Sequence, residues 1–174
     1  MHPLLDEIRE LLSAPLAGCS AEQVARHPAG DPARWSAQQV VEHLSATWRM
    51  TIAGIEDRLK KGRPLKSLPT LRQRVLQVLI CDLGYFPKRR SAPQAVQPST
   101  DEQPRVTGDE LITRLSATLA AMDSMLNRIE PEAHGGVVLN QELLGPLSVQ
   151  RWRRFHRTHA RHHLRQMERA IRGV

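Results

Sequence analysis

The 174-residue chain contains few of the residues that mark several protein classes. It has two cysteines, Cys19 and Cys81, and two thiols cannot form a disulfide framework, which favours a reducing compartment. No apolar run approaches the roughly 18 residues that a membrane span needs, so we expect no membrane partner. With 40% hydrophobic and 25% charged residues, the composition excludes a collagen-like or wholly disordered chain. The length predicts one domain over residues 1–174.

One short segment resembles a processing signal. The residues Leu16-Ala17-Gly18-Cys19 match a bacterial lipobox. A lipobox follows a basic region and an apolar stretch, whereas Asp6, Glu7, Arg9 and Glu10 occupy the positions before this one. The sequence therefore predicts an amphipathic helix that stays on the protein, and a cytoplasmic location.

Positive charge is abundant but comes almost entirely from arginine. The formal net charge is +7, and only four of the 25 basic residues are lysine, leaving 21 arginines. A basic chain can indicate a nucleic-acid partner. Arginine beside abundant alanine, leucine and proline is also what a GC-rich genome produces, and only 3% of the residues are aromatic and able to stack on bases. We therefore expect no nucleic-acid partner.

Apolar residues recur at helical spacing almost everywhere, and no segment alternates as a strand. The pattern predicts an all-α fold, a four-helix bundle with one short auxiliary helix. The long helices are expected over about Pro3–Ala14, from Ser36 to Gly62 with Pro64 beyond it, from Thr107 to a stop at Pro131, and from Ser148 onward; the auxiliary helix is expected over Thr70–Asp82 with a further short helical segment from Ser20.

Capping residues and prolines set the expected boundaries. Ser20 with Gln23, Ser36 with Gln39 and Thr107 with Glu110 have the spacing of capping boxes. Four prolines without an apolar stripe predict a long Pro-rich loop over 87–106, either mobile or wrapped on the surface. A second loop is expected around Gly135, Gly136, Gly145 and Pro146, and the helix over 70–82 is expected to use Leu71, Val75, Val78 and Leu79 as its apolar face.

The last predicted helix carries the residues with chemical potential. At 100° per residue, one side gathers Trp152, Phe155, His156, His159, His163, Gln166, Met167 and Ala170, while Arg154, Arg157, Arg161 and Arg165 lie opposite. His159 and His163 are spaced i and i+4, which lets two imidazoles converge on one metal ion. The alternative is a pair of hydrogen-bonded core histidines.

A third ligand has to come from another helix, and His43 is the candidate. It stands at the edge of the apolar face of the second long helix, beside Val40 and Thr47, where a site open to a cleft would need it. The alternative is a partly exposed histidine without a role. Trp35, just before this helix, is expected to pack on Val40 as a hydrophobic staple.

Three segments in this order resemble the DinB/YfiT-like superfamily. They are Trp35-Ser36, Glu42-His43-Leu44, and the closing stretch His159-Ala160-Arg161-His162-His163-Leu164-Arg165-Gln166-Met167; the approach from Leu143 to Ser148 is similar to a subset described as DinB-like domains of unknown function. The resemblance implies a bundle of mirror-variant up-and-down topology, often dimeric. It also implies a metal centre formed by His43, His159 and His163, with zinc or nickel as the usual ion.

Characterised relatives use such a metal with a low-molecular-weight thiol, as S-transferases or a maleylpyruvate-type isomerase. The resemblance therefore implies a metal-dependent thiol transferase or a hydrolase. Three neutral imidazoles leave an open coordination position, at which the ion would lower the pKa of water or a thiol. Glu42 and Gln166 are candidates for orienting the imidazoles, and His156 for lining the cleft or replacing a ligand. The alternative is a non-catalytic dimeric bundle, structural, stress-related or sensing, that binds metal weakly or not at all.

Overall fold

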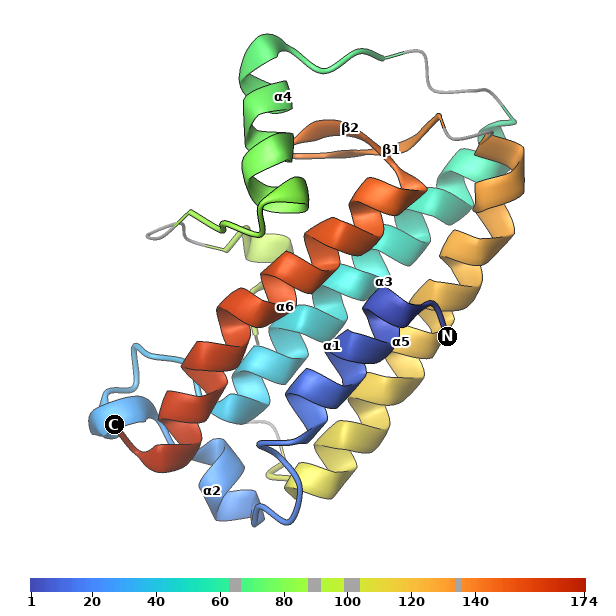
Figure 1. Ribbon diagram of the computed structural model, residues 1–174. Helices are drawn as coiled ribbons and strands as arrows, with labels where there is room; N and C mark the ends of the chain where they lie inside the picture. The colour runs from blue at the N-terminus through green and yellow to red at the C-terminus, as the bar shows by residue number, and fades with distance from the viewer. Residues whose placement is uncertain (63–66, 88–91, 99–103, 134–135) are drawn as a thin grey trace.

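The computed structural model describes residues 1–62, 67–87, 92–98, 104–133 and 136–174, and these are mostly helical (Figure 1). Pro64, Gly135 and two stretches of the predicted loop, 88–91 and 99–103, lie outside the described residues. The α-helices are α1 (Pro3–Ser13), α2 (Ala21–Ala25), α3 (Ala37–Lys61), α4 (Leu71–Gln77), α5 (Gly108–Ala133) and α6 (Val149–Arg172). The shorter elements are the 3₁₀ turns η1 (Pro28–Gly30) and η3 (Gln94–Val96), the π-helical turn η2 (Val78–Asp82), and the strands β1 (Val137–Gln141) and β2 (Gly145–Ser148).

Four helices, α1, α3, α5 and α6, lie side by side around one core (Figure 1). α3 contacts α5 and α6, and α1 contacts the same two helices from its own side. Their inward faces are aliphatic, with Trp48 as the largest fully buried side chain. The all-α prediction is confirmed for these helices, and the mirror-variant topology stays a prediction. None of the described helices combines the length and apolarity that crossing a bilayer requires.

The helix that bears His43 begins and ends where the sequence predicts. The hydroxyl of Ser36 accepts a hydrogen bond from the Gln39 amide, and the Gln39 side-chain oxygen accepts one from the Ser36 amide, which completes the capping box. Gly62 then ends α3 with a φ of 60°, a conformation that glycine adopts without steric cost. These two signals fix the position of His43 along the bundle.

The region over 70–82 differs from the prediction in shape and in orientation. After two turns of α-helix, the chain continues as the π-helical turn η2. The predicted apolar face is wrong, because Leu71, Val75 and Val78 are exposed, Leu71 by 80%. The buried side chains are instead Gln77, Ile80 and Cys81. The helical period shows which residues form an apolar face, but it does not show whether the rest of the chain packs against that face. In the structure the apolar face that begins on α4 is exposed.

A β-hairpin stands where the sequence predicted only a loop. β1 pairs antiparallel with β2, with Leu139 opposite Leu147 and Gln141 opposite Gly145. The Gln141 side-chain oxygen accepts hydrogen bonds from the amides of Leu143 and Leu144, which closes the turn. The strands are only five and four residues long, and β2 is buried at three consecutive positions, so neither alternates clearly enough to be recognised.

One further difference concerns the end of a helix. α5 continues through Pro131 to Ala133, whereas the sequence predicted a stop at the proline. A proline in the last turn costs only one hydrogen bond to the preceding turn, so the helix can finish around it. The short helix α2 follows Ser20, where the sequence predicted a helical segment, and the Ser20–Gln23 capping box is present.

Three of the arginines on the outward side of α6 form ion pairs within the protein. Arg154 pairs with Asp82 at 2.7 Å, and Arg157 and Arg161 both pair with Glu7 of α1. These contacts fasten the outer side of α6 to η2 and α1. The predicted separation of this helix into a histidine side and an arginine side is therefore present, and the absence of a nucleic-acid partner stays a prediction.

Candidate metal centre

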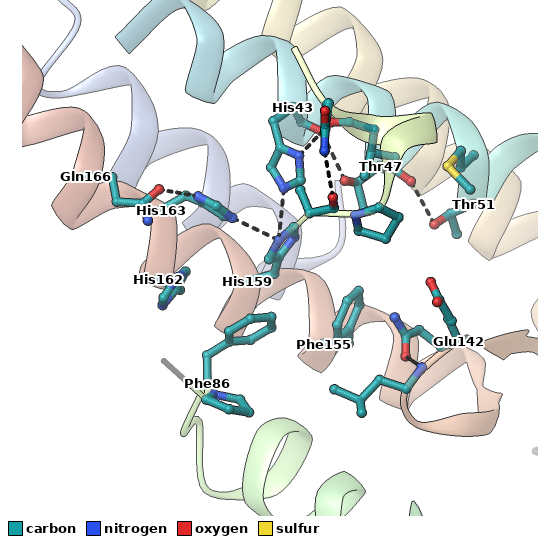
Figure 2. A pocket seen from close by; sticks show the side chains of 18 of the residues that line it. His43, Thr47, Thr51, Phe86, Glu142, Phe155, His159, His162, His163 and Gln166 are labelled. Atoms are coloured by element: carbon teal, nitrogen blue, oxygen red, sulfur yellow. Dashed lines mark hydrogen bonds between the residues drawn. The ribbon is translucent and has the colours of Figure 1, made fainter. Parts of the chain in front are cut away.

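The structure brings the side chains of His43, His159 and His163 together, and we call these residues the histidine cluster (Figure 2). Nε2 of His159 lies 3.2 Å from Nε2 of His43 and 3.0 Å from Nε2 of His163. His43 comes from α3, and the other two residues stand one turn apart on α6. The three side chains are 3%, 6% and 6% exposed. One ring nitrogen from each residue therefore faces a common point, and such a group can hold a metal ion.

The neighbours of the histidine cluster fix which ring nitrogens carry protons. Nδ1 of His43 lies 2.7 Å from the carbonyl oxygen of Val96, and Nδ1 of His163 lies 2.7 Å from the amide oxygen of Gln166. Both oxygens can only accept, so both Nδ1 atoms donate, and the corresponding Nε2 atoms are left with lone pairs. His159 has at most one proton on Nε2, so it can satisfy only one of the two. A cation at the centre satisfies all three nitrogens, and the donor set fits a metal ion.

Burial keeps the histidine cluster neutral. Desolvation lowers the pKa of His43, lowers that of His159 well below its ordinary value, and lowers that of His163 to about 3. Each imidazole also disfavours protonation of its neighbours, because like charges would lie in contact. Neutral imidazole is the form that binds a metal ion. The cluster is therefore in the ligating state at neutral pH.

Aromatic rings close two sides of the histidine cluster. The Trp35 ring stacks on His163 with ring centres 6.0 Å apart and lies 4.9 Å from His43. Phe86 stacks on His159 at 5.3 Å and contacts His162 at 4.9 Å (Figure 2). These apolar faces limit water around the imidazoles and hold the rings in place.

The π-helical turn η2 explains how Phe86 reaches this site. The hydroxyl of Thr158 on α6 donates to the carbonyl oxygen of Ile80 at 2.8 Å, which ties the turn to the helix that carries two of the histidines. The chain leaves η2 at Leu83 and delivers Phe86 to His159 three residues later. π-helical turns occur frequently at functional sites.

The histidine cluster lies in the wall of a cavity of about 1020 Å³. The cavity is bounded by α3, α6, the hairpin, and the segments that carry Arg34, Phe86 and Val96. Most of its lining is apolar or aromatic, which is usual for pockets that take small molecules. Figure 2 shows His159 and Phe155 along one side, with Glu142 reaching in from the hairpin. A ligand bound in this space would therefore have access to a cation held by the cluster.

The other candidate residues have different positions. Gln166 contacts His163, as expected for an orienting residue. Glu42 instead accepts a hydrogen bond from Gln38 on the same helix and is not part of the cavity lining. His156 is fully buried, with its Nε2 3.2 Å from the hydroxyl of Thr51 and not directed at the histidine cluster. His162, for which the sequence predicted no role, lines the cavity beside Phe86.

Sequence reasoning missed three contributors to this site. Trp35 was expected to pack on Val40, but its ring lies against two of the imidazoles. Val96 acts through its backbone carbonyl, which leaves no signal in the residue type. Phe86 stands between the helix predicted over 70–82 and the loop predicted over 87–106, in a stretch with no recognisable pattern of apolar residues. Its being one of only two phenylalanines was the one available hint.

The fold and the site define a helical protein with a buried three-imidazole cluster in the wall of a cavity. The family model of the DinB superfamily matches residues 4–167. The chain therefore belongs to the DinB superfamily, as the motifs around the three histidines indicated. No curated protein and no solved structure matches it.

Proposed function

We propose that this chain is a metal-dependent enzyme in which His43, His159 and His163 hold a divalent cation, zinc or nickel. The observation that carries the proposal is the meeting of three Nε2 atoms that have too few protons for mutual hydrogen bonds. A structural histidine cluster would pair each unprotonated nitrogen with a donor, because an unsatisfied buried polar atom costs free energy. Membership in the DinB superfamily supports the same assignment.

A divalent cation bound by three imidazoles has an open coordination position and lowers the pKa of a water or thiol that takes it. The chain's own residues supply orientation and a dry environment. The Val96 carbonyl and the Gln166 amide hold His43 and His163 in the ligating tautomer. Phe86 covers His159 from the cavity side and excludes water there.

The lining favours a nucleophile that arrives with the ligand. Among the described lining residues there is no cysteine, serine, tyrosine or lysine. The hydroxyls present, on Thr47 and Thr51, donate to the backbone carbonyls of His43 and Thr47. We therefore propose transfer of a low-molecular-weight thiol to an electrophile, with hydrolysis by water as the second candidate of the same chemistry.

Metal analysis of protein purified without a polyhistidine tag tests the metal site. We expect about one zinc or nickel ion per chain after loading. His43→Ala, His159→Ala and His163→Ala should each abolish stoichiometric binding, because two imidazoles are a much weaker donor set. His162→Ala is the matched control, since it removes a cavity imidazole outside the cluster. Loading that stays substoichiometric, or that survives His159→Ala, would contradict the proposal.

The reaction is tested separately from the metal. Zinc-loaded protein is screened with several thiols and an aromatic electrophile, and thioether formation is followed by absorbance. Conjugation that His159→Ala abolishes and His162→Ala retains would support transfer. The non-catalytic alternative, a structural or sensing bundle, predicts weak or no metal loading and neither conjugation nor hydrolysis of any compound tested.

We further propose, from the family resemblance, that the chain is a cytoplasmic homodimer. The two cysteines are unpaired, as a reducing compartment requires. The exposed apolar face formed by α4 and the first residue of η2 (Leu71, Val75 and Val78) is the surface that a second copy would cover. Sedimentation velocity should give a dimer for the wild type and a monomer for Val75→Asp. A monomeric wild type, or a Val75→Asp dimer, would contradict this interface.

A further inference from the structure

The cavity contains few full charges, and these are separated along its length. Of the described arginines, only Arg34 and Arg169 line it, and Glu142 is its one carboxylate among the described residues. The remaining lining side chains are apolar, aromatic, amide, hydroxyl or imidazole groups. The positions of these three charges therefore decide what the cavity attracts.

Arg169 belongs to the stripe of α6 that faces the cavity and is not part of the outward arginine row. Seven α6 residues line the cavity. His163 stands next to a stripe of the other six, which are spaced alternately by three and four, as on one face of a helix: Trp152, Phe155, His159, His162, Gln166 and Arg169. Arg169 is the last member of this stripe, one turn beyond Gln166. Because side chains on a helix lean toward its N-terminus, its guanidinium leans back toward Gln166 and His163.

Arg34 lines the cavity from the loop that precedes α3. It directly precedes Trp35, whose ring stacks on His163. Its backbone carbonyl lies 2.7 Å from Nδ1 of His27, which closes the loop that leads into α3. The turn η1 in this loop packs against α6. The two arginines therefore lie beyond the histidine cluster, on the side away from the hairpin.

Glu142 marks the other end. It stands in the hairpin turn, next to β1, whose Leu139 packs against Gly54 in the second half of α3. Thr47, Thr51 and Gly54 line the cavity in this order from His43 toward the hairpin. A carboxylate here repels a second anion. The hairpin end of the cavity is therefore negative, and the end with the two arginines is positive.

Neither Arg34 nor Arg169 forms an ion pair with an acidic residue that the structure describes, whereas three arginines of the outward row do. Arg34 is half-buried, and Arg169 is exposed although it lines the cavity. Guanidinium groups bind oxyanions through charge-assisted hydrogen bonds. We propose that Arg34 and Arg169 form an anion subsite, and that the ligand has an apolar or aromatic body with a carboxylate or phosphate group at this end. The inference rests on the proposed function in one respect, that the ligand binds in this cavity. It does not require a bound metal ion.

Two fluorescent probes with one ring system test the subsite in the metal-free protein. They are 1-anilinonaphthalene-8-sulfonate, which is anionic, and N-phenyl-1-naphthylamine, which lacks the sulfonate. We expect the wild type to bind the sulfonate about tenfold more tightly than the neutral compound. Arg34→Gln and Arg169→Gln should each remove most of this preference and leave the affinity for the neutral compound unchanged.

Arg128→Gln is the matched control. It removes one positive charge from an exposed position of α5, a helix that contributes no described residue to the cavity lining. It should leave the preference for the sulfonate unchanged. Equal binding of the two probes, persistence of the preference in either cavity variant, or its loss in Arg128→Gln would overturn the proposal.

Displacement of the sulfonate by small competitors identifies the anion. 3-Phenylpropionate and phenyl phosphate are compared with 3-phenylpropan-1-ol, which has no charge. Stronger displacement by 3-phenylpropionate assigns the subsite to a carboxylate, and stronger displacement by phenyl phosphate assigns it to a phosphate. Equal displacement by all three compounds overturns the proposed anion subsite. Failure of the metal proposal would appear instead in the metal content, so the two ideas fail in different measurements.

Discussion

The backbone carbonyl oxygen of Val96 lies 2.7 Å from Nδ1 of His43 and joins the turn η3 to a helix 53 positions earlier in the chain. Because a carbonyl only accepts, this contact places the proton on Nδ1 and the lone pair on Nε2, facing His159. The described part of the Pro-rich loop is therefore packed against α3, and it sets the tautomer of a candidate ligand.

The orienting contact of Gln166 can be removed without touching a ligand. Gln166→Leu deletes the acceptor of the His163 Nδ1 proton, so the ring loses the preference for the ligating tautomer. We expect the affinity for zinc to fall about 10- to 100-fold, measured by competition with a chelating dye. Gln150→Leu, an exposed position on the same helix, should have no effect. Unchanged affinity in Gln166→Leu would show that the amide does not orient the ring.

His156 should make the stability of the fold depend on pH. Burial lowers the pKa of His156 from 6.5 to about 3. As the pH falls below 6.5, the unfolded chain binds a proton at this residue and the folded chain does not. The free energy of unfolding therefore decreases, by up to about 1.4 kcal/mol per pH unit until the pH approaches 3.

Urea unfolding of the wild type and of His156→Gln between pH 7 and pH 4 checks this expectation. The variant loses buried contacts and should be less stable at pH 7. It lacks the titrating group, so its stability should fall less steeply with acid, and the difference from the wild type should narrow. A constant difference across this range would contradict the depressed pKa.

Two glycines in helices differ in what a methyl group would meet. A Cβ at Gly108 would lie 1.9 Å from the carbonyl oxygen of Leu16, a backbone atom that cannot rotate aside. Gly108→Ala should reduce the free energy of unfolding by about 2–4 kcal/mol. A Cβ at Gly54 would instead meet the end of the Leu139 side chain at 2.8 Å, and that side chain can change rotamer. Gly54→Ala should stay within about 1 kcal/mol of the wild type. Thermal unfolding of the two variants side by side measures the contrast, and equal losses would contradict it.

The hairpin depends on one buried glutamine. The side-chain amide of Gln77 donates to the carbonyl oxygens of Leu144 and Pro146 at 2.8 and 3.0 Å, and its oxygen accepts from Arg151. Gln77→Leu leaves these groups without partners, at a cost of about 1–3 kcal/mol each. Amide hydrogen exchange in residues 137–148 should accelerate, whereas Arg72→Leu, exposed on the same helix, should leave it unchanged. Slow exchange in Gln77→Leu would show that the hairpin is stable without the hydrogen bonds of the Gln77 side chain.

Prediction succeeded where the signal is local. The capping box at Ser36, the glycine after Lys61 and the i,i+4 spacing of His159 and His163 each depend on neighbours within a few residues. Prediction failed for α4, since the same stripe of Leu71, Val75 and Val78 is compatible with a buried or an exposed face. It failed for the hairpin as well, because each strand is too short to show a period.

By itself the sequence determined the long helices, most of their starting residues and the i,i+4 spacing of His159 and His163, because capping chemistry and helical period act over one or two turns of chain. His43 was added to that pair as a candidate and by the family resemblance. Only the tertiary structure decided that three Nε2 atoms meet, that a distant carbonyl fixes the tautomer of His43, and that two of the arginines face the cavity. These relationships join residues far apart in the chain, and packing between helices, which no local pattern encodes, sets their geometry.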